Sequence, residues 1–129
     1  MVRVFIISIL ILQTAELVFA EPTALHSNAD SVNVENGARL AHGKKLYEKF
    51  CAQCHGLEGQ PTAEMSDLFN PPVAPLNAFG YKYGNTLEGI SASIKNGRAT
   101  AMLSFRDRLS QSQIEAVARY VESLSKPQP

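Results

Sequence analysis

The chain has 129 residues, and its 12 lysines and arginines balance its 12 aspartates and glutamates. This length allows one small domain. A net charge of zero gives no reason to expect nucleic acid or an anionic membrane surface as a partner, because both attract strongly basic proteins. Two cysteines and no tryptophan leave a small core. A core of this size is usually marginal, so we expect something else to stabilise the fold.

The first 20 residues have the pattern of a secretory signal peptide. Arg3 supplies the positive start, residues 4–12 form an almost unbroken apolar run, and Val18-Phe19-Ala20 has the small residues of a cleavage site. The apolar run is too short to cross a bilayer comfortably, because a transmembrane helix needs roughly 20 residues. We therefore expect cleavage after Ala20 and export, with an uncleaved membrane anchor as the alternative.

The next stretch, residues 21–35, is polar and has no convincing period, so it is predicted to be a flexible leader. The folded domain is predicted at residues 36–126. Its first helix is predicted over residues 36–54, before two glycines that can end it. The residues of one helical face recur there at three- and four-residue spacing: Leu40, Gly43, Tyr47, Phe50, Cys51 and Cys54.

Residues 56–84 are predicted to be a long connection. They contain four prolines, at positions 61, 71, 72 and 75, which interrupt regular hydrogen-bonded structure. A structureless stretch of this length is unusual inside a compact domain. A chain that wraps around a large prosthetic group would explain it.

Two further helices are predicted from their capping residues and apolar faces. The first covers residues 85–96, with Asn85 as its N-cap, and the second covers residues 111–124, with Ser110 and Gln113 as a capping box. Their buried faces are predicted to be Leu87, Ile90 and Ile94 in the first, and Ile114, Val117, Val121 and Leu124 in the second. No stretch alternates as a strand would, so the fold class is predicted to be all-α.

The residues Cys51-Ala52-Gln53-Cys54-His55 form a C-x-x-C-H motif, which is the attachment sequence for c-type haem. On a helix, positions i, i+3 and i+4 lie on one face, so two sulfurs and an imidazole can approach the same flat ring. The thiols of Cys51 and Cys54 would add to the two vinyl groups of one haem as thioethers. His55 would be the proximal ligand of the iron.

Three other interpretations of the two cysteines stay open. A dithiol redox site normally lies in a βαβ unit, and the sequence has no strand pattern. Structural zinc needs four ligands, and only His26 and His42 remain as nitrogen donors, without a matching spacing. A disulfide between cysteines this close would be strained. Haem attachment is the preferred interpretation.

Beyond the motif, the chain resembles the class I cytochromes c, the small soluble bacterial monohaem proteins in particular. Three stretches carry this resemblance: Gly43-Lys44-Lys45-Leu46-Tyr47 in the first helix, Lys95-Asn96-Gly97 with Ala101-Met102 and Phe105 in the distal loop, and Val117, Tyr120, Val121 and Leu124 in the last helix. It extends from about Asn36 to Leu124. The resemblance implies a cytochrome c-like domain, in which the N- and C-terminal helices cross around one covalently bound haem c, and a periplasmic location.

The resemblance also implies that Met102 is the second axial ligand of the iron, through its thioether sulfur. Met65 is a rival ligand, ten positions after His55. Ordinary core packing is a further interpretation of Met102, because methionine is a common core residue. The family usually has proline directly after this methionine, whereas this chain has Leu103, which implies a less rigid loop.

A further implication concerns the second ring nitrogen of His55. In the family, a carbonyl from a proline-containing loop normally accepts its N–H and so fixes the orientation of the ring. The stretch Asn70-Pro71-Pro72 is the expected source of that carbonyl, with Pro61 as the rival. The prolines would otherwise only stiffen the connection.

The resemblance implies a soluble carrier that passes single electrons between exported or membrane-bound redox proteins. Such a carrier needs no acid, base or nucleophile, so we expect no enzymatic activity of its own and a monomeric protein. Two alternatives stay open. The first is a haem subunit of a larger oxidoreductase. The second is a haem protein with a displaceable sixth ligand for sensing or peroxidase-like chemistry, and Leu103 in place of the usual proline supports keeping it.

Charge is unevenly distributed along the chain. Residues 51–80 contain three acids and no lysine or arginine, whereas residues 81–129 contain seven bases and four acids. Four of these bases lie around Met102: Lys95, Arg98, Arg106 and Arg108. They are predicted to dock an acidic surface of a redox partner, with an ordinary solvated face as the alternative.

Overall fold

The computed structural model describes residues 28–78, 85–98 and 101–125. Their regular structure is helical: α1 (Asn28–Phe50), α2 (Ala52–His55), α3 (Ala63–Asp67), α4 (Leu87–Asn96) and α5 (Gln111–Leu124). The all-α prediction is therefore confirmed for this part of the chain. None of these helices has the length and apolar character of a membrane span. The predicted signal segment and its cleavage site at Ala20 lie outside the described residues.

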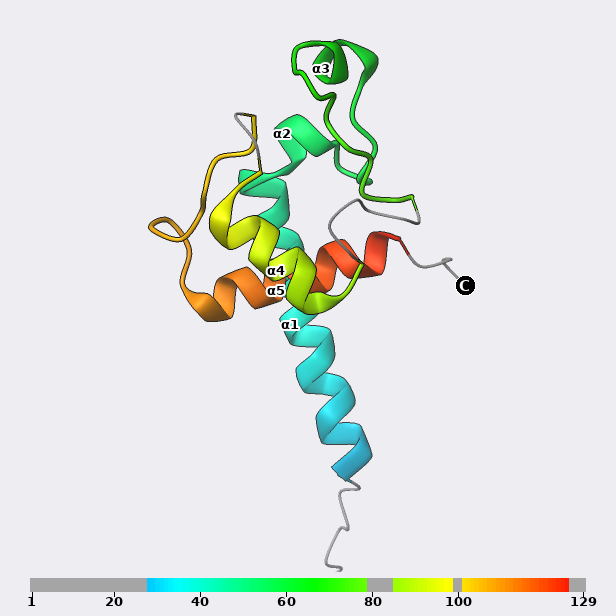
Figure 1. Cartoon of the computed structure of the whole chain (residues 1–129). Helices are drawn as coiled ribbons and strands as arrows, with labels where there is room; N and C mark the ends of the chain where they lie inside the picture. Colours follow the sequence, from blue (N-terminus) through cyan, green and yellow to red (C-terminus); the bar gives the residue numbers. More distant parts are fainter. Residues whose placement is uncertain (1–27, 79–84, 99–100, 126–129) are drawn as a thin grey trace, which may run out of the picture.

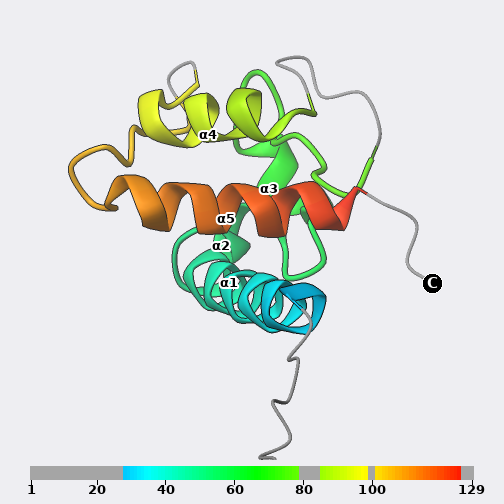
Figure 2. The same ribbon diagram turned by 90° about the horizontal axis from the view of Figure 1, so that it is seen from below.

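The predicted crossing of the first and last helices is confirmed. Figure 1 shows α1 and α5 crossing near the middle of the molecule, and Figure 2 shows α5 between α1 and α4. The two backbones approach so closely that a Cβ atom at Gly43 would overlap the carbonyl oxygen of Ala116. Beside this contact the rings of Tyr47 and Tyr120 pack 5.1 Å apart at 59°, a tilted geometry that aromatic pairs favour.

The crossing lies at the centre of the hydrophobic core. The side chains of Tyr47 and Val117 are fully buried. Further core residues come from α4, from the loop before α5 and from α5 itself: Ile90, Ile94, Phe105, Leu109, Ile114, Ala118, Tyr120 and Val121. The predicted apolar faces of the second and last helices therefore form this core together, with Leu87 and Leu124 at its edge.

The first helix differs from the prediction at both ends. It begins at Asn28, so a flexible leader over residues 21–35 is wrong for residues 28–35. Residues 31–42 are exposed along this part of the helix, which projects from the body in Figure 1. A helix in solvent needs no apolar face, and the Glu35–Arg39 ion pair at 2.6 Å supports this one.

Towards its other end, the predicted helix over residues 36–54 breaks at Cys51, which has a φ of −121°. The helix resumes as α2, so that the predicted turn of helix through Cys54 and His55 is present.

The remaining corrections concern capping and the long connection. The connection contains a short helix, α3, whose first turn is capped by Thr62 through Met65 N–H at 3.2 Å. Thr86 rather than Asn85 caps α4, accepting from Gly89 N–H at 3.2 Å. The predicted capping box of α5, formed by Ser110 and Gln113, is confirmed.

Candidate functional site

The C-x-x-C-H motif begins with Cys51 at the break after α1, and its other four residues form α2. The Cys51 carbonyl oxygen accepts hydrogen bonds from the N–H groups of Cys54 at 3.1 Å and of His55 at 2.9 Å. These bonds place the three residues in one helical turn, as the spacing predicts. Both cysteines are half-buried and are free thiols. The structure thus brings the three motif residues together within one turn.

His55 is held by a carbonyl of the long connection. Its Nδ1 lies 3.1 Å from the Ala74 carbonyl oxygen. A carbonyl oxygen can only accept, so Nδ1 carries the proton and Nε2 keeps its lone pair. The expectation of a carbonyl from a proline-containing loop is confirmed, because Ala74 directly precedes Pro75. Its predicted source in residues 70–72 is wrong.

Burial determines the charge state of the same imidazole. Desolvation lowers the pKa of His55 below its usual value, although the Ala74 hydrogen bond acts in the opposite direction. The ring is therefore neutral at neutral pH. A neutral imidazole with a free Nε2 and a fixed Nδ1–H is the form in which histidine ligates a metal.

Cys51 has the properties of a buried thiol. Desolvation, followed by the neighbouring Cys54, raises the pKa of Cys51 to about 11. A dithiol redox site needs a thiol with a lowered pKa, so this environment disfavours the redox interpretation. Among the described residues there is no group of three or more His, Cys, Asp or Glu side chains that could hold a metal ion. Zinc thus gains no support from this part of the chain.

These donors fit a covalently attached haem. Two neighbouring thiols and one neutral, oriented imidazole lie in a single turn, which is the donor set of c-type attachment. Apolar side chains of the loops after α2, α3 and α4 lie open to solvent, with exposed fractions of 63% for Leu57, 72% for Leu68 and 70% for Leu103. A large apolar ring is a group against which such side chains would pack.

Met102 lies in a closed turn after α4. Its backbone exchanges two hydrogen bonds with Arg98, at 2.8 and 3.1 Å. The turn requires glycine at position 97, which has a φ of +74° and where a Cβ atom would overlap the Met102 carbonyl oxygen. The Met102 side chain is half-buried against the core. Met65 lies half-buried on α3. The assignment of Met102 as the iron ligand stays a prediction.

The four predicted docking residues differ in their surroundings. Arg98 is half-buried and donates from Nε to Ser93 Oγ at 2.9 Å. Lys95, Arg106 and Arg108 are exposed. The Arg106 guanidinium bonds Asn96 Oδ1 at 2.6 Å, and that of Arg108 lies 5.2 Å from the Phe50 ring centre and 5.0 Å from that of Phe105. Arg98 therefore supports the fold of this loop, while the other three face solvent.

Sequence reasoning missed one contact at the motif. The Tyr47 hydroxyl, at the heart of the helix crossing, donates to the Gly56 carbonyl oxygen at 2.6 Å. Gly56 directly follows His55. The sequence shows an aromatic residue about one turn before the motif, but its role as a donor depends on how the chain turns back after α2.

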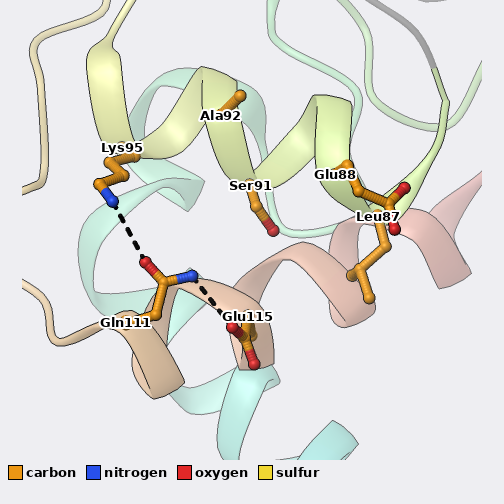
Figure 3. Close-up of a pocket in the computed structure, with 7 residues that line it drawn as sticks. All are labelled: Leu87, Glu88, Ser91, Ala92, Lys95, Gln111 and Glu115. Carbon is orange, nitrogen blue, oxygen red and sulfur yellow. Dashed lines mark hydrogen bonds between the residues drawn. The ribbon is translucent and has the colours of Figure 1, made fainter.

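Two cavities lie away from the motif, on either side of α5. The first, of about 320 Å³, lies between α4 and α5 and is shown in Figure 3, where Ser91 and Glu115 face each other across it. Its lining is largely polar, and Lys95 bonds Gln111 at its edge at 3.5 Å. The second, of about 510 Å³, lies between α1 and α5 and includes His42. Neither cavity contains a residue of the C-x-x-C-H motif.

Comparisons with known proteins agree with the fold and the motif. Residues 38–121 match the family model described as cytochrome C oxidase, cbb3-type, subunit III. The chain is 31% identical over 91 residues to the cbb3-type oxidase subunit CcoP of Azospirillum sp. (strain B510), a match that covers 69% of this chain and 30% of that relative. It is 37% identical over 90 residues to cytochrome c6 of Cyanidioschyzon merolae, covering 69% of this chain and 78% of that relative.

A solved structure, the KustC0563 c-type cytochrome, superposes with a TM-score of 0.56 at 26% identity. The superposition covers 65% of this chain and 98% of the other. The chain therefore spans 30% of the length of the CcoP relative, but 78% of the cytochrome c6 relative and 98% of the KustC0563 chain.

Proposed function

The chain belongs to the cytochrome c family that the cbb3-type oxidase subunit III model describes, and we propose that it is an exported monohaem carrier of single electrons. The observation that carries this proposal is the turn in which Cys51, Cys54 and the carbonyl-bound His55 lie together. When bound, haem would supply an iron that takes up and releases one electron. The residues of this chain would attach and orient the haem.

In this proposal, each motif residue has a separate task. The thiols of Cys51 and Cys54 would hold the ring covalently. His55 would present Nε2 to the iron, while the Ala74 carbonyl fixes the direction of the imidazole through Nδ1–H. Met102 would supply a soft thioether sulfur to the iron, which favours the reduced state. Apolar side chains such as Leu57, Leu68 and Leu103, which are exposed here, would exclude water if they packed against the ring, and would so limit solvent reorganisation during electron transfer.

A redox titration of the matured holoprotein tests the carrier function. A carrier should show one reversible one-electron transition, and all spectra between the reduced and oxidised forms should share the same isosbestic points. Two or more transitions would indicate further haems, and an irreversible change would indicate chemistry at the iron. The N-terminal sequence of the same sample should begin at Glu21 if the signal segment is removed after Ala20.

We further propose that Lys95, Arg106 and Arg108 dock an acidic redox partner. Their exposure supports this role, and the exposed Leu103 beside them adds apolar contact area. Arg106→Glu together with Arg108→Glu should slow reduction by an anionic small-molecule reductant at low salt, and the difference should fade at high salt.

Arg39→Glu is the control for this test, because Arg39 is also exposed but lies on α1, among residues 31–42. Equal slowing per reversed charge in the control would mean that overall net charge, rather than a local docking surface, controls the rate. No slowing in the double variant would overturn the docking proposal.

The second candidate is a haem subunit of a larger oxidoreductase. The match to the cbb3-type subunit III model and to CcoP supports it. An affinity tag on the C-terminus, followed by purification from the native host in mild detergent, separates the two candidates. A stoichiometric complex that retains oxidase activity favours the subunit, whereas a monomer recovered without partners favours the free carrier.

A further inference from the structure

The Gly56 carbonyl oxygen connects the helix core with the loop beneath the motif. It accepts hydrogen bonds from the Tyr47 hydroxyl at 2.6 Å and from Gly59 N–H at 3.3 Å. Tyr47 is 0% exposed, so its hydroxyl has a fixed position. Gly56 has a φ of +75°, and a Cβ atom there would overlap the Gln60 carbonyl oxygen. The turn after His55 is therefore tight, and Tyr47 holds it from the core side.

Further hydrogen bonds lead from this turn back to His55. The Gly59 carbonyl oxygen accepts from Leu76 N–H at 2.6 Å. Two residues before Leu76, the Ala74 carbonyl oxygen lies 3.1 Å from His55 Nδ1. The path thus starts at the Tyr47 hydroxyl, passes through Gly56, Gly59 and the backbone near Leu76, and ends on the imidazole. Most of the loop between is exposed or half-buried, so backbone hydrogen bonds, rather than deep apolar burial, link the Ala74 carbonyl to the turn.

We propose that Tyr47 is a positioning residue for His55, acting through the turn and the loop that carry the Ala74 carbonyl. The inference rests on the proposed function, because it assumes that His55 ligates a haem iron. Core packing alone does not require the hydroxyl: the Tyr47 ring packs on Tyr120, and phenylalanine would fill the same space. The hydroxyl, which phenylalanine lacks, donates the bond to Gly56.

The consequence appears in the electronic properties of the ligand. A firm Nδ1–H···O=C bond raises the basicity of a ligating imidazole, which favours the oxidised iron. When the loop becomes more mobile, this hydrogen bond weakens, and the reduced iron becomes more stable relative to the oxidised iron. Removal of the Tyr47 hydroxyl should therefore raise the reduction potential of the holoprotein. It should also speed solvent exchange of the His55 ring N–H by about tenfold, the effect of losing one net hydrogen bond.

Tyr47→Phe tests this in the matured holoprotein, with Tyr120→Phe as the matched control. Tyr120 is the ring partner of Tyr47 in the same core, but its hydroxyl is not the donor to Gly56. We expect a higher potential and faster exchange of the His55 ring N–H, followed by NMR, in Tyr47→Phe only. Unchanged values in Tyr47→Phe, or equal shifts in both variants, would overturn the proposal.

Hydrogen exchange in the wild-type holoprotein keeps the proposal testable if Tyr47→Phe does not fold. The N–H groups of Gly59, Leu76 and the His55 ring should then open as one cooperative unit, with the same dependence on denaturant. Independent opening of the three groups would contradict a connected path. Failure of the proposed function is distinguishable, because the wild-type protein would then lack a histidine-ligated haem altogether.

Discussion

The α1–α5 crossing and the segment of residues 56–78 are stabilised in different ways. At the crossing, Tyr47 and Val117 are fully buried and the backbones touch at Gly43. In the segment, almost every side chain is exposed or half-buried, and backbone hydrogen bonds such as Leu76 N–H to Gly59 hold the chain. Burial of apolar surface is the main source of stability in folded proteins. The crossing is therefore stabilised by apolar burial, which is marginal in a core of this size, whereas the segment depends on the crossing and on the proposed haem.

The largest expected effect is on the segment. Cys54→Ala removes one of the two proposed thioethers, and with it the firm attachment of the group that completes the small core. We expect a protein that is largely unfolded or accumulates poorly, as measured by yield and by circular dichroism. A cooperative thermal transition from haem-free protein would mean that the crossing alone stabilises the whole domain.

The crossing itself is tested by Gly43→Ala. The added methyl overlaps the Ala116 carbonyl oxygen, which is backbone and cannot move aside without separating the helices. We expect a loss of about 3 kcal/mol in the free energy of unfolding of the holoprotein, measured with guanidinium chloride.

Gly37→Ala is the control for that substitution. It lies on the same helix with no atom within 4 Å of the added methyl, and alanine is the better helix former, so it should stabilise by about 0.5–1 kcal/mol. Equal losses in the two variants would mean that helix formation, rather than the close approach, is being measured.

A smaller effect is expected in the distal loop. Gly97→Ala places a side chain at a φ of +74° and against the Met102 carbonyl oxygen. The strain should cost about 1–2 kcal/mol of stability. If Met102 ligates the iron, the optical spectrum should also show partial loss of the sulfur ligand. A stable protein with an unchanged spectrum would contradict the closed turn that the structure shows.

The smallest expected effect is on the pH dependence of stability, through Tyr120 at the crossing. Burial, with a further contribution from Glu58 and Glu48, raises the pKa of Tyr120 above its usual value. The folded state thus holds the phenol proton more tightly than the unfolded state. Its contribution to stability is complete below the usual tyrosine pKa of about 10 and is lost as the pH rises through the folded value. Above a pH of about 10, the free energy of unfolding, measured by denaturant titration, should fall less steeply with pH in Tyr120→Phe than in wild type. The same dependence on pH in both proteins would exclude this linkage.

Local patterns in the sequence predict most of the crossing. The bounds of α5 and its Ser110–Gln113 capping box are confirmed because both depend on residues close in sequence. The exposed start of α1 was not predictable from an apolar face: Leu40, placed on the predicted face, is 39% exposed, and Val32 and Val34 are exposed as well. The cap of α4 was displaced by one residue, because Asn85 and Thr86 are both good capping residues.

At the site, too, features that depend on nearby residues were predictable, and contacts between distant residues were not. The spacing of Cys51, Cys54 and His55 predicts a shared helical turn, and the structure has it. The Ala74 carbonyl lies 19 residues after His55, on a loop whose path no short-range pattern determines. The bond from Tyr47 to Gly56 likewise depends on how the chain turns back after α2. Contacts of this kind follow from the tertiary path, so sequence periodicity cannot supply them.

Haem content after maturation tests the central claim most directly. Chain expressed together with haem-attachment machinery should give a pyridine haemochrome spectrum for one haem per polypeptide. Its intact mass should equal that of the processed polypeptide plus one haem. A colourless product with the mass of bare polypeptide, from cells that mature a control cytochrome normally, would contradict the account.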